Sequence, residues 1–360
     1  MEHDFIKTFI KRCAVFIAIW ILTSGCTAFG IRIGEPRASN TPANIQRDRR
    51  IGIFKSVDKG KSFIFKGRVT EKETVDNLNI SRLQFDPQDT LTLYLLSKNK
   101  GLWVSYNGGE SVENLVEGEA DAFALDPEKR GTIYLAKGAK ILQSRDGGTV
   151  WNSIPVETGG DLIAAIAVHP SLSARIFAVT RNGSLFGSED NGASWRLMKK
   201  IRVKTIKDLI INSKNPNEMY IATEYEGVFQ SEDMGVNWNI LHALKSFKGS
   251  ERVHQFKINQ QNPSHLFLAS SAGLLISQDS GGTWTAPTLL SSSGAGTVTA
   301  IGFNPLREQE LYYGTKESLF KSVNNGESWS ALPLYTEGEP VEILVDDLDG
   351  NIVYIGVGKN

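Results

Sequence analysis

The sequence predicts an all-β protein, a seven-bladed β-propeller with four-stranded blades, and three observations support this prediction. An eight-residue phrase, Ser-x-Asp-x-Gly-x-x-Trp, occurs in seven full or degenerate copies at intervals of 39 to 49 residues. Short apolar runs punctuated by Pro and Gly fill the intervals and indicate strands, and no 3.6-residue apolar period competes with them. Four strands in a repeat of roughly 44 residues are typical of a propeller blade.

The phrase has the composition of a tight turn between two strands. Asp or Asn accepts hydrogen bonds from backbone N–H groups two residues on and tolerates left-handed backbone, and Gly supplies a positive φ. The final aromatic residue begins the next strand and buries a large apolar area. The first copy ends in Phe63 and the second in Val112, where the other five have Trp. The turn residues are Ser56 and Asp58; Ser105 and Asn107; Ser144, Asp146 and Trp151; Ser188, Asp190 and Trp195; Ser231, Asp233 and Trp238; Ser277, Asp279 and Trp284; Ser322, Asn324 and Trp329.

This phrase resembles the Asp-box (BNR) repeat, and the resemblance covers residues 51–360. Such boxes occur in sialidases, xyloglucan-type glycosidases, sortilin-type receptors and the photosystem II stability/assembly factor family. In those families the box is a turn outside the active site, so the resemblance implies no catalytic role for the box residues. Over its whole length the chain resembles the photosystem II assembly factor-like propellers. That resemblance implies a lipid-anchored or translocated scaffold that helps a membrane complex to assemble.

Between boxes a second pattern recurs, and it defines the other strands of each repeat. A first apolar run ends in Asp-Pro, Asn-Pro or His-Pro, a second contains Leu-Tyr or Ile-Phe, and a third leads into the box Ser. His169 takes the place of the Asp in its repeat and is predicted to be a turn residue. Tyrosines share one position in the second run and are predicted to lie in the core: Tyr94, Tyr134, Tyr220, Tyr312 and Tyr354.

The two ends of the repeat region predict how the ring closes. Residues 51–56 read as a third strand with no first or second strand before them. Residues 341–346 and 352–355 read as first and second strands with no box after them. We expect these segments to form one shared blade, which leaves no free sheet edge.

The first fifty residues lie outside the repeats. Lys7, Lys11 and Arg12 precede the apolar run of residues 14–22, as in a secretory signal peptide. Gly25-Cys26 resembles a bacterial lipoprotein box, although Thr23 stands where Leu is usual, so an ordinary signal peptide cut nearby remains an alternative. We expect a signal peptide over residues 1–25, lipidation of Cys26, a polar tether over residues 26–50 and the propeller over residues 51–360.

No catalytic set emerges from the residues. A sialidase needs a nucleophilic Tyr and an arginine cluster, and the arginines here do not recur at matching repeat positions. A glycosidase needs two carboxylates across a cleft, for which Asp76, Glu119, Asp121 and Asp161 are candidates in loops before first strands. The histidines lack metal-ligand spacing, and no nucleotide-binding fingerprint is present. We therefore predict no catalytic, cofactor or metal site.

One charge feature stands apart from the repeats. Two consecutive connections between repeats carry many cations, which predicts a basic patch for an acidic partner or lipid headgroups unless they are simply solvated loops. The residues are Arg196, Lys199, Lys200, Arg202, Lys204, Lys207, Lys245, Lys248 and Arg252, with Lys257 following.

These observations favour a non-enzymatic, monomeric propeller, lipid-anchored on the periplasmic or cell-surface side, that binds a protein or peptide as a scaffold for a membrane or envelope complex. The formal net charge of −1 argues against a nucleic-acid partner. The alternative is a carbohydrate-binding or glycoside hydrolase-like surface protein of the sialidase or xyloglucanase type. The tryptophans argue against it, because five end boxes, Trp103 lies in a third strand and Trp20 in the signal segment.

Overall fold

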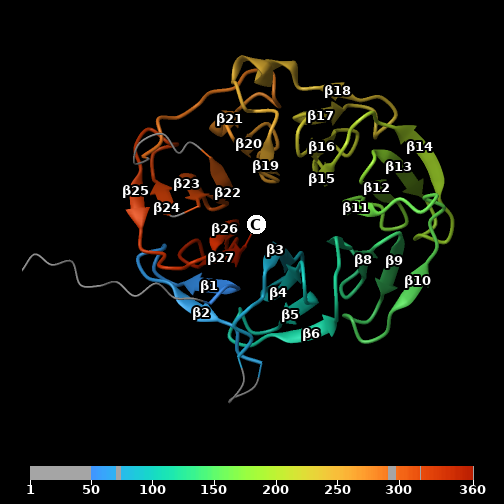
Figure 1. The fold of residues 1–360 in the computed structure, drawn as a ribbon, viewed down its shortest axis with the longest axis horizontal. Coiled ribbons are helices and arrows are strands. Elements are labelled where there is room, and N and C mark those ends of the chain that lie inside the picture. Colours follow the sequence, from blue (N-terminus) through green and yellow to red (C-terminus); the bar gives the residue numbers. More distant parts are fainter. Residues whose placement is uncertain (1–49, 70–73, 291–296, 317, 360) are drawn as a thin grey trace, which may run out of the picture. The chain divides into compact units, whose positions relative to one another are not determined.

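A computed structural model describes residues 50–69, 74–290, 297–316 and 318–359. These residues form seven antiparallel sheets arranged as blades around a ring (Figure 1), which confirms the predicted seven-bladed β-propeller. The predicted signal peptide, Cys26 and nearly all of the predicted tether lie outside the described residues. Among the residues described, no helix is long and apolar enough to cross a membrane.

Each blade begins with a strand next to the ring centre and ends with an outer strand. Blade 1 contains β3 (Ile80–Asp86), β4 (Asp89–Ser97), β5 (Gly101–Ser105) and β6 (Glu113–Val116). Blade 2 contains β7 (Ala122–Leu125), β8 (Ile133–Lys137), β9 (Lys140–Ser144) and β10 (Asn152–Ile154). Blade 3 contains β11 (Ile163–Val168), β12 (Ile176–Thr180), β13 (Ser184–Ser188) and β14 (Arg196–Lys200). Blade 4 contains β15 (Ile206–Ile211), β16 (Met219–Thr223), β17 (Val228–Ser231) and β18 (Asn239–Ile240).

Blade 5 differs from the others in its outer strand. It contains β19 (Val253–Ile258), β20 (Leu266–Ser270) and β21 (Gly273–Ser277), and a short 3₁₀ helix, η1 (His242–Ser246), precedes it. The fourth strand is reduced to one bridge between Ile276 and Thr285. Pro287 follows two residues later and has no N–H with which to continue the ladder. Blade 6 contains β22 (Val298–Asn304), β23 (Arg307–Thr315), β24 (Leu319–Ser322) and β25 (Ser330–Leu332).

Blade 7 closes the ring with strands from both ends of the described chain. Its order is β26 (Glu339–Val345), β27 (Val353–Gly358), β1 (Ile53–Ser56) and β2 (Ile64–Lys66). Phe54 pairs with Ile355, and Ser56 pairs with Val353. The shared blade predicted from the unmatched terminal strands is therefore confirmed.

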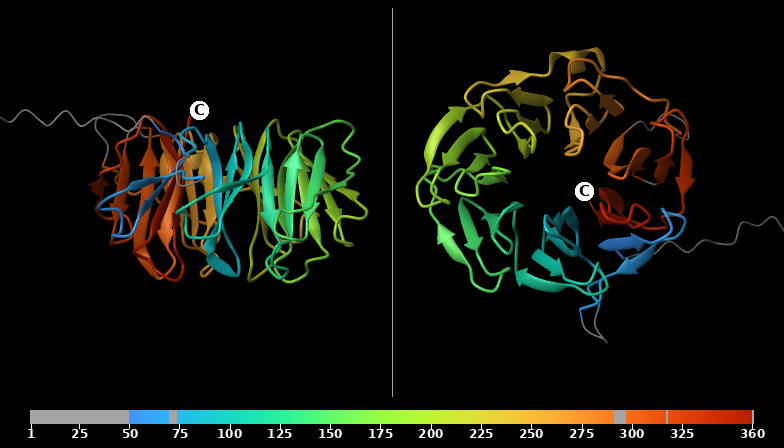
Figure 2. Two further views of the ribbon diagram at one scale, coloured as in Figure 1. Left: turned by 90° about the horizontal axis from the view of Figure 1, so that it is seen from below. Right: turned by 180° about the vertical axis from the view of Figure 1, so that it is seen from behind.

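Because the strands alternate in direction, the ring has two different faces, between which the strands run in the edge-on view of Figure 2. We call the face that carries the boxes and the first turns of the blades the box face. Seven times, the residue after the box Asp or Asn donates its backbone N–H to a carbonyl of that first turn, for example Met234 to Asn217 at 2.8 Å and Asn325 to Gln309 at 3.1 Å. The opposite face, the connection face, carries the turns between second and third strands and the links between blades.

Each box is closed by the same set of hydrogen bonds. In the clearest copy the Ser277 Oγ accepts the Gly281 N–H at 2.9 Å and donates to Asp279 at 2.8 Å. The Asp279 carboxylate accepts the Thr283 N–H at 2.8 Å, four residues on, where two residues on was expected. Left-handed backbone falls on the residue after the Asp, Ser280 (φ 55°), and on Gly281 (φ 92°) rather than on the Asp itself. The Gly is needed there because a side chain would be strained.

The first turns use a second repeated device. The last residue of the first strand, such as Asp86 or Asn304, accepts the backbone N–H two residues on with its side-chain oxygen. His169 fills this place in blade 3, where its Nδ1 accepts the Ser171 N–H at 3.2 Å. The prediction that His169 is a turn residue is confirmed.

The core lies between blades, as seven apolar clusters that each join two neighbouring blades. The five second-strand tyrosines are all buried, as predicted. The prediction that all five box tryptophans are core residues is wrong for four of them. Trp284 is buried at 8% exposure, whereas the other four are half-buried and contact the clusters from the side. All five stand where the box leads toward the ring periphery, and Trp284 differs in belonging to a buried cluster that includes Leu241 and Leu244, beside and within η1.

Candidate functional site

A cavity of about 1220 Å³ occupies the ring centre and is lined by the first strands of the blades. Its lining includes Lys98 and Asp161 near the connection face and Phe303 and Pro305 near the box face. The propeller topology creates this cavity, because the first strands of the blades surround one axis and their side chains point toward it.

Charged side chains bridge the cavity at mid-height and join blades that are not neighbours. The Arg82 guanidinium of blade 1 donates to the Asp208 carboxylate of blade 4 at 3.0 Å, and this carboxylate raises the pKa of Arg82. In blade 7 the Glu342 carboxylate contacts the Lys257 ammonium at 2.5 Å and accepts from the Gln255 amide at 2.8 Å. Two cations here balance two carboxylates, so this layer holds the ring together and leaves no excess charge for a ligand.

Cations gather where the cavity opens on the connection face. The Lys207 ammonium donates to the backbone carbonyls of Val253 at 3.2 Å and His254 at 3.5 Å. Burial lowers the pKa of Lys207, and the positive charges of Lys98 and Arg252 act in the same direction while Glu224 opposes them. Burial and the nearby charges of Lys207 and Arg252 also lower the pKa of His254. Burial is the largest cause of both lowered pKa values and the neighbouring positive charges add to it, so a bound anion would favour the charged forms of both groups. We call Lys98, Lys207, Arg252 and His254 the cationic mouth.

An exposed aromatic ring lies beside the cationic mouth. Tyr225, in the turn between β16 and β17, is 50% exposed. The Arg252 guanidinium lies 5.9 Å from its ring centroid. An aromatic face next to a cation gives the mouth an apolar contact surface as well as a charge.

Of the four carboxylates proposed for glycosidase chemistry, three line the cavity: Glu119, Asp121 and Asp161. Glu224 lines it as well. Asp76 is not among the lining residues. The Asp121 carboxylate pairs with the Arg181 guanidinium at 2.6 Å and accepts the Gly138 N–H at 3.2 Å. The Asp161 carboxylate accepts the Asn182 N–H at 3.3 Å. These contacts fix both carboxylates to the turns of the connection face.

The structure separates the residues of the predicted basic patch into several locations. Arg196, Lys199 and Lys200 lie on the outer strand β14, where Arg196 pairs with Glu189 at 3.5 Å. Arg202 and Lys204 lie in the link to blade 4, and Lys245 and Lys248 lie in or just after η1. Lys204 and Lys207 line the cavity, and Arg252 lies within electrostatic range of Lys207. Lys257 forms part of the mid-height layer.

Sequence reasoning missed two members of the cationic mouth, Lys98 and His254. Lys98 follows the second strand of blade 1, far along the chain from the predicted patch. The strand pattern contains a usable signal, because turns after second strands and links between blades must share one face. Among the described residues, no group of three or more His, Cys, Asp or Glu side chains is placed to hold a metal ion.

The ring resembles solved propellers of two kinds. The GH74 xyloglucanase from Xanthomonas campestris aligns with a TM-score of 0.65 and 18% identity, over 85% of this chain and 52% of the enzyme chain. The structure of YCF48 bound to D1 peptide aligns with a TM-score of 0.61 and 15% identity, over 81% of this chain and 99% of the YCF48 chain. YCF48 from Cyanidioschyzon merolae aligns with a TM-score of 0.61 and 14% identity, over 77% of this chain and 94% of the YCF48 chain.

A curated relative also belongs to the xyloglucanase group. The probable oligoxyloglucan-reducing end-specific xyloglucanase of Neosartorya fischeri is 24% identical over 236 residues, or 60% of this chain. Those residues make up 28% of the relative, so this chain spans well under half of it. No family model matches the chain. At these identities the likeness establishes the fold, and the expected resemblance to photosystem II assembly factor-like propellers is confirmed at that level.

Proposed function

We propose that this protein is a non-enzymatic propeller that binds an acidic segment of a protein or peptide at its cationic mouth and acts as a scaffold. The observation that carries the proposal is the placement of Lys98, Lys207, Arg252 and His254 around one opening, with Glu224 and Glu339 as the opposing carboxylates. A bound carboxylate restores the charge balance there, and Tyr225 supplies stacking area for the neighbouring residues of a peptide.

The proportions of the similar structures support a peptide ligand. This chain covers 99% of a YCF48 chain that was solved with a peptide bound, but 52% of a xyloglucanase chain. A single ring offers the ends of its central cavity as concave surfaces, and a peptide is a ligand that such an opening accommodates.

We further propose that the protein is exported and anchored through a lipid on Cys26. The described chain enters the ring at the connection face, where the carbonyl of Arg50 accepts from the Thr336 hydroxyl at 3.2 Å. The tether of residues 27–50 spans at most about 85 Å when extended, so an anchored ring can turn its cationic mouth toward a partner at the membrane surface.

Peptide binding by the full chain tests the proposal. Fluorescence anisotropy with acidic, neutral and basic peptides of equal length should show binding of the acidic peptide alone. Lys207→Gln and Arg252→Gln should each weaken it about 5- to 10-fold, with a further loss at high salt. Lys140→Gln is the matched control, because Lys140 is an exposed connection-face lysine outside the cavity lining. Equal binding of all three peptides would contradict the proposal.

A glycoside hydrolase is the second candidate, favoured by the curated xyloglucanase relative and by the carboxylates that line the cavity near the connection face, Glu119, Asp121, Asp161 and Glu224. Hydrolysis of bonds in sugars requires one of two carboxyl groups to act as acid and the other as base or nucleophile. Incubation with xyloglucan oligosaccharides and measurement of new reducing ends tests it. Activity that Asp121→Asn and Asp161→Asn abolish would replace the scaffold proposal.

A further inference from the structure

The repeats place equivalent side chains just beneath the box face of every blade. Four positions define this place: the residue that ends the first strand or directly follows it, the residue two before the second-strand aromatic, that aromatic itself and the residue before the box Ser. Two more residues border it, the one three after the first-strand end and the left-handed box residue of the next blade. At the second of these positions two blades have a carboxylate, Glu218 and Glu310, and the other five have Thr92, Thr132, Arg175, His265 and Ile352.

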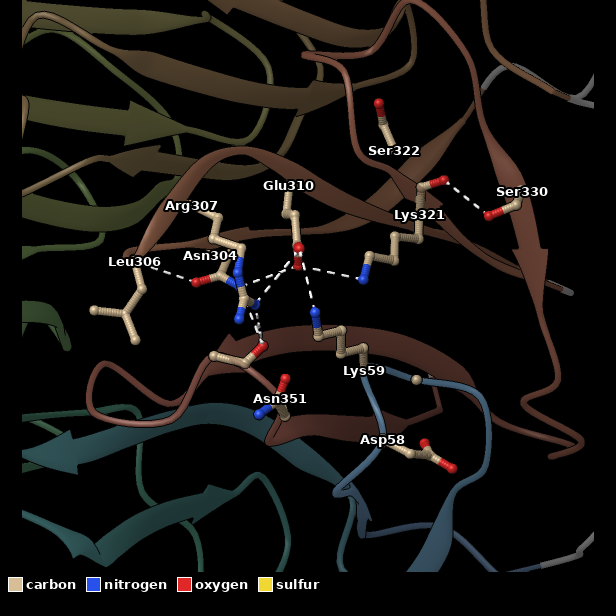
Figure 3. A network of polar contacts seen from close by, with 12 residues as sticks. Asp58, Lys59, Asn304, Leu306, Arg307, Glu310, Lys321, Ser322, Ser330 and Asn351 are labelled. Atoms are coloured by element: carbon tan, nitrogen blue, oxygen red, sulfur yellow. Dashed lines mark hydrogen bonds and ion pairs between the residues drawn. The ribbon is translucent and has the colours of Figure 1, made fainter. Parts of the chain in front are cut away.

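In blade 6 a carboxylate fills this place (Figure 3). Glu310 accepts from the Asn304 amide at 3.1 Å and contacts the Lys321 ammonium at 3.2 Å. The Arg307 guanidinium lies 3.5 Å from it, and the ammonium of Lys59, from the box of blade 7, lies 4.0 Å away. The buried Glu310 is thus held by cations and an amide on every side that the figure shows.

In blade 4 a carboxylate fills the same place with a different partner set. Glu218 accepts from the Tyr220 hydroxyl at 2.6 Å and from the Gln230 amide at 2.8 Å. Its other oxygen accepts from the Asn212 amide at 2.5 Å. Tyr, Gln and Asn at these positions therefore form a donor set that fits one carboxylate.

In blade 2 the residue at this place is Thr132, and the space is open. A cavity of about 200 Å³ is lined by Lys129, Thr132, Tyr134, Gln143, Arg145 and Asn191. Five of these six occupy the positions of Arg307, Glu310, Tyr312, Lys321 and Lys59 in blade 6. We call it the blade-2 pocket. Its Tyr134 and Gln143 match the donor pair Tyr220 and Gln230, and the Gln143 amide already donates to the Tyr134 hydroxyl at 2.9 Å, which leaves the hydroxyl proton free for a ligand.

Asp126 takes the place of Asn212 and Asn304 behind the pocket. It is 2% exposed, and its Oδ1 accepts the N–H groups of Glu128 and Lys129 and the Ser173 hydroxyl. Its Oδ2 is buried without a hydrogen-bond partner. The Oδ1 of Asp126 makes the same turn contacts as the Oδ1 of Asn212 in blade 4. The Oδ2 of Asp126 therefore occupies the place of the Asn212 amide nitrogen, which in blade 4 donates to the Glu218 carboxylate.

We propose that the blade-2 pocket binds a carboxylate group, which takes the place that Glu310 and Glu218 fill in blades 6 and 4. Lys129 and Arg145 at the pocket carry two positive charges against the one carboxylate of Asp126 behind it, so the site favours an anion. The ligand carboxylate accepts from Tyr134, Gln143 and the two cations. Acetate and the side chain of an acidic residue of a partner share this chemistry.

The unpaired oxygen of Asp126 gives the site a pH dependence. A ligand carboxylate beside Asp126 Oδ2 requires one proton between the two carboxyl groups, so binding takes up one proton. The other groups facing the pair are Lys129, Arg145 and Tyr134, and burial raises the pKa of the Tyr134 hydroxyl. Affinity should therefore rise as pH falls from 7 toward about 6, where free acetate itself is still almost fully ionised.

Binding of ¹³C-labelled acetate to the full chain, followed by NMR, tests the proposal. Wild type should bind one acetate saturably, and Thr132→Glu, which places an internal carboxylate in the pocket, should weaken binding at least 10-fold. Thr149→Glu is the control, because Thr149 is exposed on the same box outside the pocket and adds the same charge. Arg145→Gln, an exposed substitution that leaves the fold intact, should weaken binding about 3- to 10-fold.

Asp126→Asn gives the blade-2 pocket the amide of blades 4 and 6. It should tighten acetate binding at pH 7 about 10-fold and abolish the pH dependence. Weaker binding in Asp126→Asn, unchanged binding in Thr132→Glu, or no saturable binding of either probe to wild type would overturn the proposal. A peptide with a single Glu distinguishes the sources: binding of both probes assigns a site for free carboxylates, and binding of the peptide alone assigns a site for a partner's acidic side chain.

Discussion

Trp284→Ala is the substitution whose cost the structure defines best. Trp284 is the most buried box tryptophan, at 8% exposure, and belongs to the cluster between blades 4 and 5. Its indole N–H donates to the Gly281 carbonyl at 3.1 Å, which ties the ring to its own box. Removal of the indole therefore affects a core contact and a turn at once.

The magnitude follows from the buried area. A tryptophan buries on the order of 150–250 Å², worth about 4–6 kcal/mol at ~25 cal/mol per Å². Alanine retains part of this buried area, so the expected cost of Trp284→Ala is about 3–5 kcal/mol, as for other large aromatic deletions in cores. Trp238 makes the same indole hydrogen bond, to Gly235 at 3.0 Å, but is half-buried, so Trp238→Ala should cost about half as much.

Urea denaturation of the two variants and wild type, followed by far-UV circular dichroism, measures both costs. Because neighbouring blades share their cores, each loss should lower the midpoint of the whole ring. Equal costs for Trp284→Ala and Trp238→Ala, or a Trp284→Ala cost below about 1 kcal/mol, would refute the reasoning from burial.

Three further predictions follow from other parts of the chain. Hydrogen bonds from the Ser62 and Ser56 hydroxyls and the Ser62 N–H lower the pKa of Asp58 to about 2. The stability that the Asp58 carboxylate contributes is therefore complete above pH ~4 and is lost as pH falls toward 2. Asp58→Asn should reduce the steepness of acid unfolding. Val112 is 2% exposed, and Val112→Ala should cost about 1–3 kcal/mol in urea denaturation, less than Trp284→Ala. Cys26→Ala should release the protein from the membrane fraction, and an unprocessed variant that stays bound would show that the lipoprotein prediction is wrong.

Much of the fold could be predicted from the sequence because each structural position recurs once per repeat, so that the copies can be compared with one another. Seven boxes fix the number of blades, and the unpaired strand of residues 51–56 predicts ring closure beside β27. The five second-strand tyrosines reveal a core position by recurring at it. The depth of the box tryptophans could not be predicted in this way, because recurrence shows that positions are equivalent but not how far they lie from the ring axis.

The candidate site was harder to predict because it depends on contacts across the ring. Arg82 and Asp208 are 126 residues apart and meet only because blades 1 and 4 face one axis. Lys98 and Arg252 approach Lys207 for the same reason. A run of cations along the chain is a poor guide to such a cluster, since Arg196 to Lys200 share the run but lie on an outer strand. Alignment of the repeats is a better guide, and it places Thr132 at the same position as Glu218 and Glu310.

Photo-crosslinking of an acidic peptide to the full chain tests the central claim most directly. A benzophenone-labelled acidic peptide, irradiated with the protein and mapped by mass spectrometry, reports where the peptide lies. Our account predicts crosslinks around the cationic mouth, in the turns that carry Tyr225 and Lys98, and their loss in Lys207→Gln but not in Lys140→Gln. Crosslinks on the box face, or a pattern that Lys207→Gln leaves unchanged, would contradict it.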